Sequence, residues 1–90
     1  MSRTIITVVG KDTVGIIARV CTYLADHNVN ILDISQTILQ DMFNMLMIVD
    51  ASRSELSHEA LAGGLKTLGE GIGITITCQK EEIFESMHRI

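Results

Sequence analysis

The chain contains no proline and no tryptophan, and its few aromatic residues are Tyr23, Phe43 and Phe84. Its seven lysine and arginine residues are scattered among eleven aspartate and glutamate residues, which gives a formal net charge of −4. No basic cluster is present to neutralise a row of phosphates, and few rings are present on which bases could stack. No apolar run approaches the roughly 20 residues that cross a bilayer. These absences argue against nucleic-acid binding and against a transmembrane protein.

Cysteine is also rare, and the two cysteines form no CxxC motif. Cys21 and Cys78 lie inside apolar patterns, so we expect buried, reduced thiols. The first residues (MSRT) have no signal-peptide architecture before strand-like sequence begins. We therefore expect a cytoplasmic protein.

Hydrophobic residues are abundant, at 47% of the chain. Because aromatic residues are few, isoleucine, valine, leucine and methionine must form the core of a domain this small. Neither a linker nor a low-complexity stretch divides the sequence. We expect a single domain over residues 1–90, with a core of residues 3–79 and a tail of residues 80–90 whose apolar residues have helical spacing.

Hydrophobic periodicity predicts four strands and two helices. The strands are expected over residues 4–9, 29–40, 42–49 and 72–78, and the helices over residues 14–27 and from residue 57 to the glycines at 69–73. The alternation slips between Ile31 and Ile34, which indicates a bulge or an edge strand, and Gln40-Asp41 predicts a turn. With right-handed crossovers, this order predicts an α+β fold of the ferredoxin-like βαββαβ type. It has four antiparallel strands, the first and third of them central, and two helices on one face.

Each helix has recognisable ends and an apolar stripe. The expected stripe of the first helix consists of Val14, Ile17, Cys21 and Leu24, with Ile16 and Val20 beside it. That of the second helix consists of Leu61, Leu65 and Leu68. Asp12 or Thr13 can cap the first helix, and Asn28 can end it in a left-handed conformation. Ser57 is the expected cap of the second helix. The glycine pair at 63–64 predicts the close approach of another backbone.

Three stretches together resemble the ACT domain family. They are the glycine-bearing turn GKDTVG at residues 10–15, the helix end ADHN at 25–28, and VNI at 29–31, which opens the second strand. The resemblance spans residues 3–79. DISQT at 33–37 and IFESM at 83–87 look like the small stand-alone bacterial and archaeal members. The chain is similar also to the ACT repeats of the glycine-cleavage transcriptional repressor.

The resemblance implies a sensor of an amino acid or a similarly small metabolite. In the ACT domain of phosphoglycerate dehydrogenase, two copies join side by side through their second strands, and the effector lies at that seam. By this resemblance Asp12 takes a ligand-contacting turn position, Gly15 the helix-opening glycine and Asn30 the asparagine of the second strand. The ligand-binding residues expected here are Asp12, Thr13, Val14, Gly15, Asn30 and Ile31.

The same residues have suitable chemistry in their own right. Amide N–H groups near Thr13, Val14 and Gly15 at a helix start favour a carboxylate, and Gly15 lets a ligand approach the backbone closely. Asp12 can accept from an ammonium group, and Asn30 can both donate and accept. The chain departs from the family where Val14 replaces the usual proline and Asp12 the frequent amide, so the ligand's identity does not carry over. A helix cap alone for Asp12 and a turn end for Asn30 remain open alternatives.

Other chemical sites find little support in the sequence. The turn lacks the Lys-Ser/Thr ending of a P-loop. His27, His58 and His88 have no zinc-ligand spacing, and no serine has the elbow motif of a nucleophile. The methionines at 42–47 suit core packing better than a copper site. We expect no metal, no cofactor and no catalytic residue.

We therefore expect a small-molecule-responsive homodimer that signals to a separate protein, without enzyme activity and without direct contact with nucleic acid or membrane. The open edge of the polar second strand needs covering, which favours the dimer. The alternative is a protein-interaction module of the same fold that binds no ligand.

Overall fold

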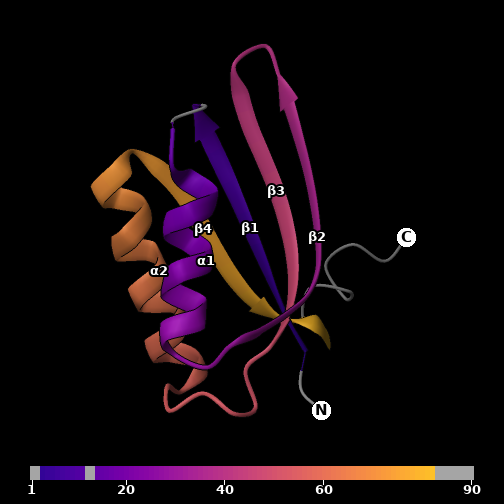
Figure 1. Cartoon of the computed structure of the whole chain (residues 1–90), viewed down its shortest axis with the longest axis vertical. Helices are drawn as coiled ribbons and strands as arrows, with labels where there is room; N and C mark the ends of the chain where they lie inside the picture. The colour runs from indigo at the N-terminus through magenta and orange to yellow at the C-terminus, as the bar shows by residue number, and fades with distance from the viewer. Residues whose placement is uncertain (1–2, 12–13, 83–90) are drawn as a thin grey trace.

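The β-branched residues of the first segment favour an extended backbone, and this strand lies between two others in one sheet. A computed structural model describes residues 3–11 and 14–82. Its elements are β1 (Arg3–Lys11), α1 (Ile16–Asp26), β2 (Asn30–Leu39), β3 (Met42–Asp50), α2 (His58–Ile72) and β4 (Ile74–Lys80). Neighbouring strands are antiparallel and their order is β2-β3-β1-β4 (Figure 1). The predicted ferredoxin-like fold, with the first and third strands central, is confirmed.

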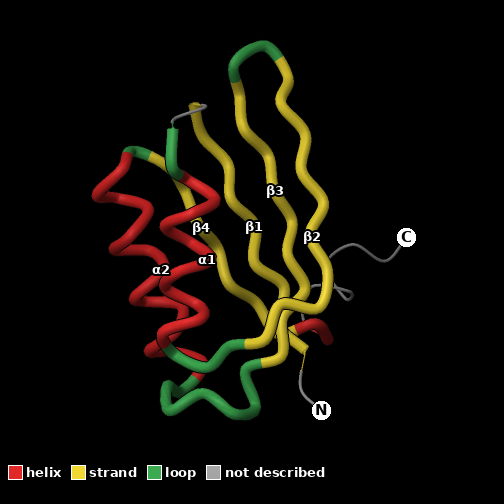
Figure 2. Tube along the Cα trace, viewed as in Figure 1, coloured by secondary structure: helices red, strands yellow, loops and turns green. Residues whose placement is uncertain are grey.

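Both helices lie on the same face of the sheet, and the hydrophobic core lies between these two layers (Figure 2). Buried side chains alternate along β3, as with Met47 and Val49, and from Ile6 to Val8 of β1, although Ile5 of β1 is buried as well. A sheet covered on one face requires this alternation, since successive side chains point to opposite faces. Aliphatic and methionine side chains make up most of the core, together with Phe43, as the composition predicts.

β2 lies at an edge of the sheet, and its irregular alternation has the predicted cause. Its pairing register with β3 shifts between Ile31 and Asp33, which marks a bulge. Gln40 and Asp41 then form the turn to β3, with φ of 50° and 69°. Such left-handed residues are typical of two-residue hairpin turns. One side of the β2 backbone therefore has no strand partner within the described residues.

α1 begins later than its periodicity predicts, because Gly15 is its N-cap residue and Ile16 its first helical residue. The buried stripe consists of Ile16, Val20 and Leu24, which lie one turn apart. Val14 precedes the helix and is fully exposed, and Ile17 is 37% exposed, so their assignment to the buried stripe is wrong. Asn28 follows the helix with φ of 58°, the predicted left-handed conformation.

α2 begins as predicted, because the Ser57 hydroxyl accepts a hydrogen bond from the Ala60 N–H at 3.1 Å. Its end differs from the prediction. Ile72, the expected first residue of the last strand, is the last residue of α2. Gly73 ends the helix with φ of 74°, and β4 follows directly and continues to Lys80.

The glycine pair in the middle of α2 has two different environments. At Gly64 an added Cβ would overlap the side chain of Tyr23 from α1, whereas at Gly63 it would meet nothing within 4 Å. The predicted close approach therefore holds for one glycine of the pair, and the neighbour is a side chain rather than a backbone.

The strand β4 leads to the end of the described part of the chain. Glu81, directly after β4, forms an ion pair with Arg3 of β1, with 3.5 Å between nitrogen and oxygen. Residues 83–90, whose apolar spacing predicts a helix, lie outside the described residues. Among the described helices, none is both long enough and apolar enough to cross a membrane.

Candidate functional site

The turn that leads into α1 holds the first group of predicted site residues. Gly15 has φ of 89° and ψ of 4°, and it offers no side chain to cap the helix. A Cβ on Gly15 would meet nothing within 4 Å, so the turn requires glycine for its left-handed backbone rather than for space. Val14, before it, is fully exposed. Asp12 and Thr13 lie outside the described residues.

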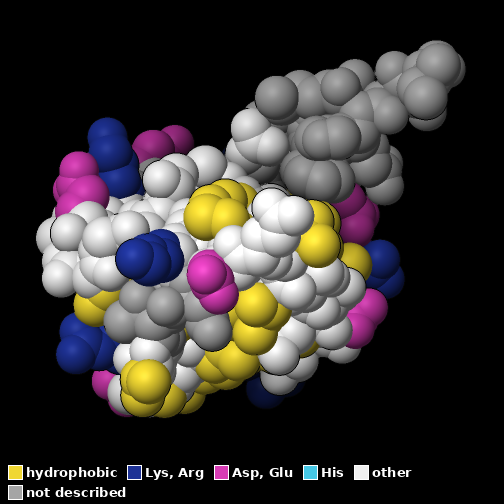
Figure 3. All heavy atoms as spheres, turned by 90° about the horizontal axis from the view of Figure 1, so that it is seen from above, with side chains coloured by type: hydrophobic (Ala, Val, Ile, Leu, Met, Phe, Trp, Pro, Cys, Tyr) yellow, Lys and Arg dark blue, Asp and Glu magenta, His cyan; other side chains and the backbone are white. Residues whose placement is uncertain are grey.

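A hollow lies beside this turn, between the first turn of α1 and the far end of β2. It has a volume of about 510 Å³ and is lined by residues 14–18, Gln36, Ile38 and Phe43, none of them charged. Ile17 and Ile38 are 37% and 55% exposed. Figure 3 looks onto this end of the molecule and shows hydrophobic side chains that are open to solvent. We term this feature the apolar hollow.

Asn30 and Ile31, the remaining predicted site residues, lie at the opposite end of β2. Asn30 is exposed and pairs with Asp50 of β3, whereas Ile31 is half-buried and packs against the core. β2 has 10 residues, so its ends are roughly 30 Å apart at about 3.3 Å per residue. Figure 1 shows α1 beginning near the far end of this strand. A single chain therefore does not bring Asn30 together with Gly15.

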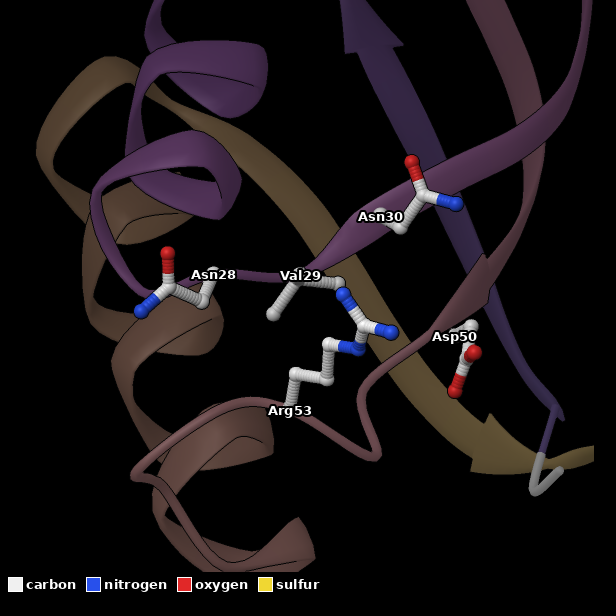
Figure 4. Close-up of a pocket in the computed structure, with 5 residues that line it drawn as sticks. All are labelled: Asn28, Val29, Asn30, Asp50 and Arg53. Atoms are coloured by element: carbon white, nitrogen blue, oxygen red, sulfur yellow. The ribbon is translucent and has the colours of Figure 1, made fainter.

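Asn30 instead lines a second pocket, which the sequence did not predict. This pocket has a volume of about 680 Å³ and is lined by Asn28, Val29, Asn30, Asp50 and Arg53. It lies where the chain passes from α1 into β2 and leaves β3 for α2 (Figure 4). The Arg53 side chain extends from the β3–α2 connection toward Val29 and Asn30, and Asp50 flanks it at the end of β3. We term this feature the polar pocket.

The charged groups of the polar pocket form few hydrogen bonds with other residues. Asp50 Oδ1 accepts a hydrogen bond from the Ser52 N–H at 3.0 Å. This bond lowers the pKa of the Asp50 carboxyl below its ordinary value, and the charge of Arg53 contributes less. Within the described residues, no hydrogen bond or ion pair involves the side chain of Arg53, Asn28 or Asn30. Arg53 therefore offers its five N–H donors to the pocket, beside an ionised carboxylate with acceptor sites to spare.

Apolar side chains are exposed along the open edge of the sheet. On β2 they are 40–65% exposed, and they are Leu32, Ile34, Ile38 and Leu39. The other edge strand, β4, carries no large hydrophobic side chain among the exposed ones of the described residues. An unpaired strand with exposed apolar side chains favours pairing with another chain. Of the two edges, β2 is the one suited to such a partner.

A histidine–glutamate pair and two thiols are the notable titratable groups outside the two pockets. His27 Nδ1 lies 2.5 Å from Glu55 Oε2, and this contact lowers the pKa of Glu55. Cys21 and Cys78 are free and half-buried rather than fully buried, and burial raises the pKa of Cys78 to about 11. In the part of the chain that the structure describes, no three histidine, cysteine, aspartate or glutamate side chains are placed to hold a metal ion.

Comparisons with known proteins agree on family and fold. A family model described as the ACT domain matches residues 2–79. A UPF0237 protein of Bifidobacterium longum is 62% identical over 90 residues, which is 100% of both chains. The structure is similar to an ACT domain protein from Streptococcus pneumoniae, with a TM-score of 0.81, 37% identity, and coverage of 93% of this chain and 94% of that chain. A protein described as a glycine cleavage system transcriptional repressor shares the fold, with a TM-score of 0.76, 21% identity, and coverage of 88% of this chain and 45% of that chain.

Proposed function

Because this chain belongs to the ACT domain family, we propose that it is a regulatory module that senses a small molecule and has no catalytic activity of its own. It works as a homodimer and passes its ligand-bound state to a separate protein. The expected effectors are amino acids and similarly small metabolites. The module is one domain, with its core at residues 3–79 and a tail at residues 80–90.

The exposed apolar edge along β2 supports the homodimer. Antiparallel pairing of two β2 strands about a two-fold axis would continue the sheet from one chain into the next. It would also give partners to the edge backbone groups and cover apolar side chains such as Ile34 and Ile38, which are 40% and 55% exposed in the single chain. We term the line of contact between the two strands the seam.

The positions of Gly15 and Asn30 at opposite ends of β2 carry the proposal of a shared ligand site. In antiparallel pairing, the start of one β2 lies beside the end of the other. Asn30 of one protomer would then lie next to the turn into α1 of its partner. The effector would bind between residues 12–15 of one protomer and Asn30 and Ile31 of the other, once at each end of the seam. A ligand held in this way favours the paired state, because it gains contacts there that a single chain lacks.

Mixing of two variants tests the shared site, after light scattering has given the oligomeric state and a thermal-shift screen has supplied a bound metabolite. Asp12→Ala and Asn30→Ala are each expected to weaken binding by about tenfold or more, because each leaves a polar group unpaired. Each heterodimer of the two variants has one site in which both residues are intact, so binding at that site should recover. A monomer at micromolar concentration, or no recovery from folded variants that exchange subunits, would contradict the proposal.

A ligand-free interaction module is the second candidate, and the full exposure of Val14 favours it, since the turn alone encloses nothing. The thermal-shift screen separates the two. A ligand at 100 times its dissociation constant adds about 2.7 kcal/mol to the free energy of unfolding, and this is a shift of many degrees in a domain of this size. A stable dimer that no metabolite shifts would support the second candidate.

A further inference from the structure

The face of the sheet that points away from α1 and α2 carries a buried side chain. Ile6 and Val8 of β1 belong to the core between the sheet and the helices. Ile5 points to the opposite face, because successive side chains of a strand alternate, and it is not part of that core. Ile5 is nevertheless only 5% exposed, although both helices lie on the other side of the sheet (Figure 2). We term the face that carries Ile5 the open face.

Val9 provides an internal reference for this burial. It lies on the same strand and the same face as Ile5, and both residues pair with β3 on one side and with β4 on the other. Val9 is 41% exposed, so two flanking strands alone leave a side chain of β1 well exposed on this face. Ile48 and Leu46 of β3, which pair with Ile5 and Thr7, are half-buried. The burial of Ile5 therefore indicates a further cover at this end of β1.

The chain leaves β4 at the same end of the open face. Arg3 lies two residues before Ile5, so the two side chains share a face. The ion pair between Arg3 and Glu81, with 3.5 Å between nitrogen and oxygen, brings the start of the C-terminal segment to β1. Glu81 and Glu82 are helical. A helix therefore begins directly after β4, beside the place where Ile5 is covered.

The sequence that follows is suited to such a cover. Residues 83–90, which lie outside the described residues, have apolar side chains at positions i, i+1, i+4 and i+7. These four are Ile83, Phe84, Met87 and Ile90. In a helix they form one stripe about 120° wide, and the remaining residues are polar or charged. A helix continued from Glu81 thus has one apolar side that needs a partner.

We propose that the open face is the docking surface of the chain's own C-terminal segment, residues 83–90. The segment continues the helix from Glu81 and packs its apolar stripe over Ile5, Ile48 and Leu46. Eight helical residues extend about 12 Å, and neighbouring strands are about 4.8 Å apart. A segment that starts over β1 and runs inward from the β4 edge therefore crosses β3 and reaches β2.

The covering segment comes from the same chain rather than from a second copy. Ile83 and Phe84 follow Glu81 by less than one helical turn, so the ion pair with Arg3 holds them beside the open face. Such a tether gives the segment a far higher effective concentration at this surface than a second copy has. Docking removes apolar surface of both the stripe and the open face from water.

Methyl NMR spectra of the full chain test the contact directly, because the chain has few aromatic rings. Phe43 belongs to the core on the helix side of the sheet and Tyr23 packs against it, so neither ring faces Ile5. We expect nuclear Overhauser contacts between the Phe84 ring and the Ile5 methyl groups. We also expect an upfield ring-current shift of the Ile5 δ1 methyl that is lost in Phe84→Leu. The methyl groups of Val9, at the uncovered end of the same strand, should show neither effect.

Thermal unfolding at one protein concentration gives an independent measure. Phe84→Ser removes an apolar side chain from the stripe and is expected to lower the unfolding midpoint by at least about 5 °C. Glu85→Gln changes the polar side of the same segment and is the matched control, expected within about 3 °C of the wild type. Phe84→Ser combined with Ile48→Ala should lower the midpoint by less than the sum of the two single losses, because both variants remove the same contact.

A mixture of isotope-labelled and unlabelled chains separates the two sources of the segment. The contact between Ile5 and Phe84 should remain within labelled chains. A contact found only between labelled and unlabelled chains would assign the open face to a second copy and overturn the proposal. Two other results would also overturn it: no contact between Phe84 and Ile5 in the wild type, and a midpoint of Phe84→Ser no lower than that of Glu85→Gln.

Discussion

Gly63 and Gly64 are adjacent in α2 but have different surroundings, so an alanine at each position tests how the two helices pack. A Cβ at Gly64 would overlap the Tyr23 hydroxyl and lie 2.8 Å from the ring carbon Cζ, whereas one at Gly63 would meet nothing within 4 Å. The Tyr23 ring lies against His27, with 4.6 Å between the two ring centroids. His27 in turn contacts Glu55.

The magnitudes follow from helix propensity and from this overlap. Gly63→Ala is expected to raise the free energy of unfolding by about 1 kcal/mol, the usual advantage of alanine in a helix interior. Gly64→Ala gains the same propensity but must displace the Tyr23 ring, and overpacking of this kind costs about 1–3 kcal/mol. Gly64→Ala should therefore be less stable than Gly63→Ala by about 1–3 kcal/mol, and no more stable than the wild type.

Urea denaturation followed by circular dichroism measures this difference, at one protein concentration because association would make stability depend on concentration. Tyr23→Leu removes the hydroxyl and Cζ. The penalty of Gly64→Ala should therefore shrink in that background, as a double-mutant cycle would show. Equal stabilisation by Gly63→Ala and Gly64→Ala would refute the contact between α1 and α2 at this point.

Two further predictions concern the turn into α1 and the histidine–glutamate pair. Gly15→Val should lower the free energy of unfolding by about 1–3 kcal/mol, since a φ of 89° strains a β-branched residue. Val14→Ala, at a fully exposed position, should stay within about 0.5 kcal/mol; equal urea midpoints would contradict this pair. The contact with His27 lowers the pKa of Glu55 below 4.5, so ionised Glu55 stabilises the folded chain above that pH and the contribution is lost as the pH falls through the folded-state pKa. The unfolding free energies of the wild type and Glu55→Gln should therefore converge below pH 4.5, and a difference that does not vary with pH would argue against the contact.

Element ends are predictable where a residue's own chemistry requires the local conformation. Asn28 and the pair Gln40-Asp41 tolerate a left-handed backbone, and the Ser57 hydroxyl caps a helix, so these ends are visible in the sequence. The spacing of apolar residues does not show at which residue a helix begins or ends. It extends α1 back to Val14, although the left-handed Gly15 delays the start of the helix.

The end of α2 is misplaced for a tertiary reason. Three glycines near the end of this helix suggest an early stop, but Gly69 lies inside it and packs against β4, where its added Cβ would lie 2.7 Å from the Ile74 carbonyl oxygen. Glycine at this position permits close packing between helix and strand rather than ending the helix. The sequence alone cannot distinguish these two uses of glycine, so Ile72 is assigned to the strand instead of the helix.

The candidate site is predictable only in part. Gly15 and Asn30 lie in stretches that resemble the family, so both are found from the sequence, although Asn30 begins β2 and Gly15 lies at the start of α1, near the far end of that strand. Asp50 and Arg53 join Asn30 only because β3 pairs with β2 and the connection after β3 turns back toward the start of β2. A charged residue in a short connection has no periodicity that would reveal such a neighbour.

Under the proposed function, the separation of the two half-sites along β2 determines how the module would signal. A ligand bound within one protomer would have no direct effect on pairing, whereas one that bridges the seam must strengthen it. The coupling is reciprocal: any factor by which the effector tightens the dimer is also the factor by which pairing tightens effector binding. In the proposed dimer, the two-fold axis would repeat the bridge at both ends of the seam, so two bound ligands would both stabilise one interface. By this proposal, a separate protein that recognises the paired edge strands would respond to the effector without contacting it.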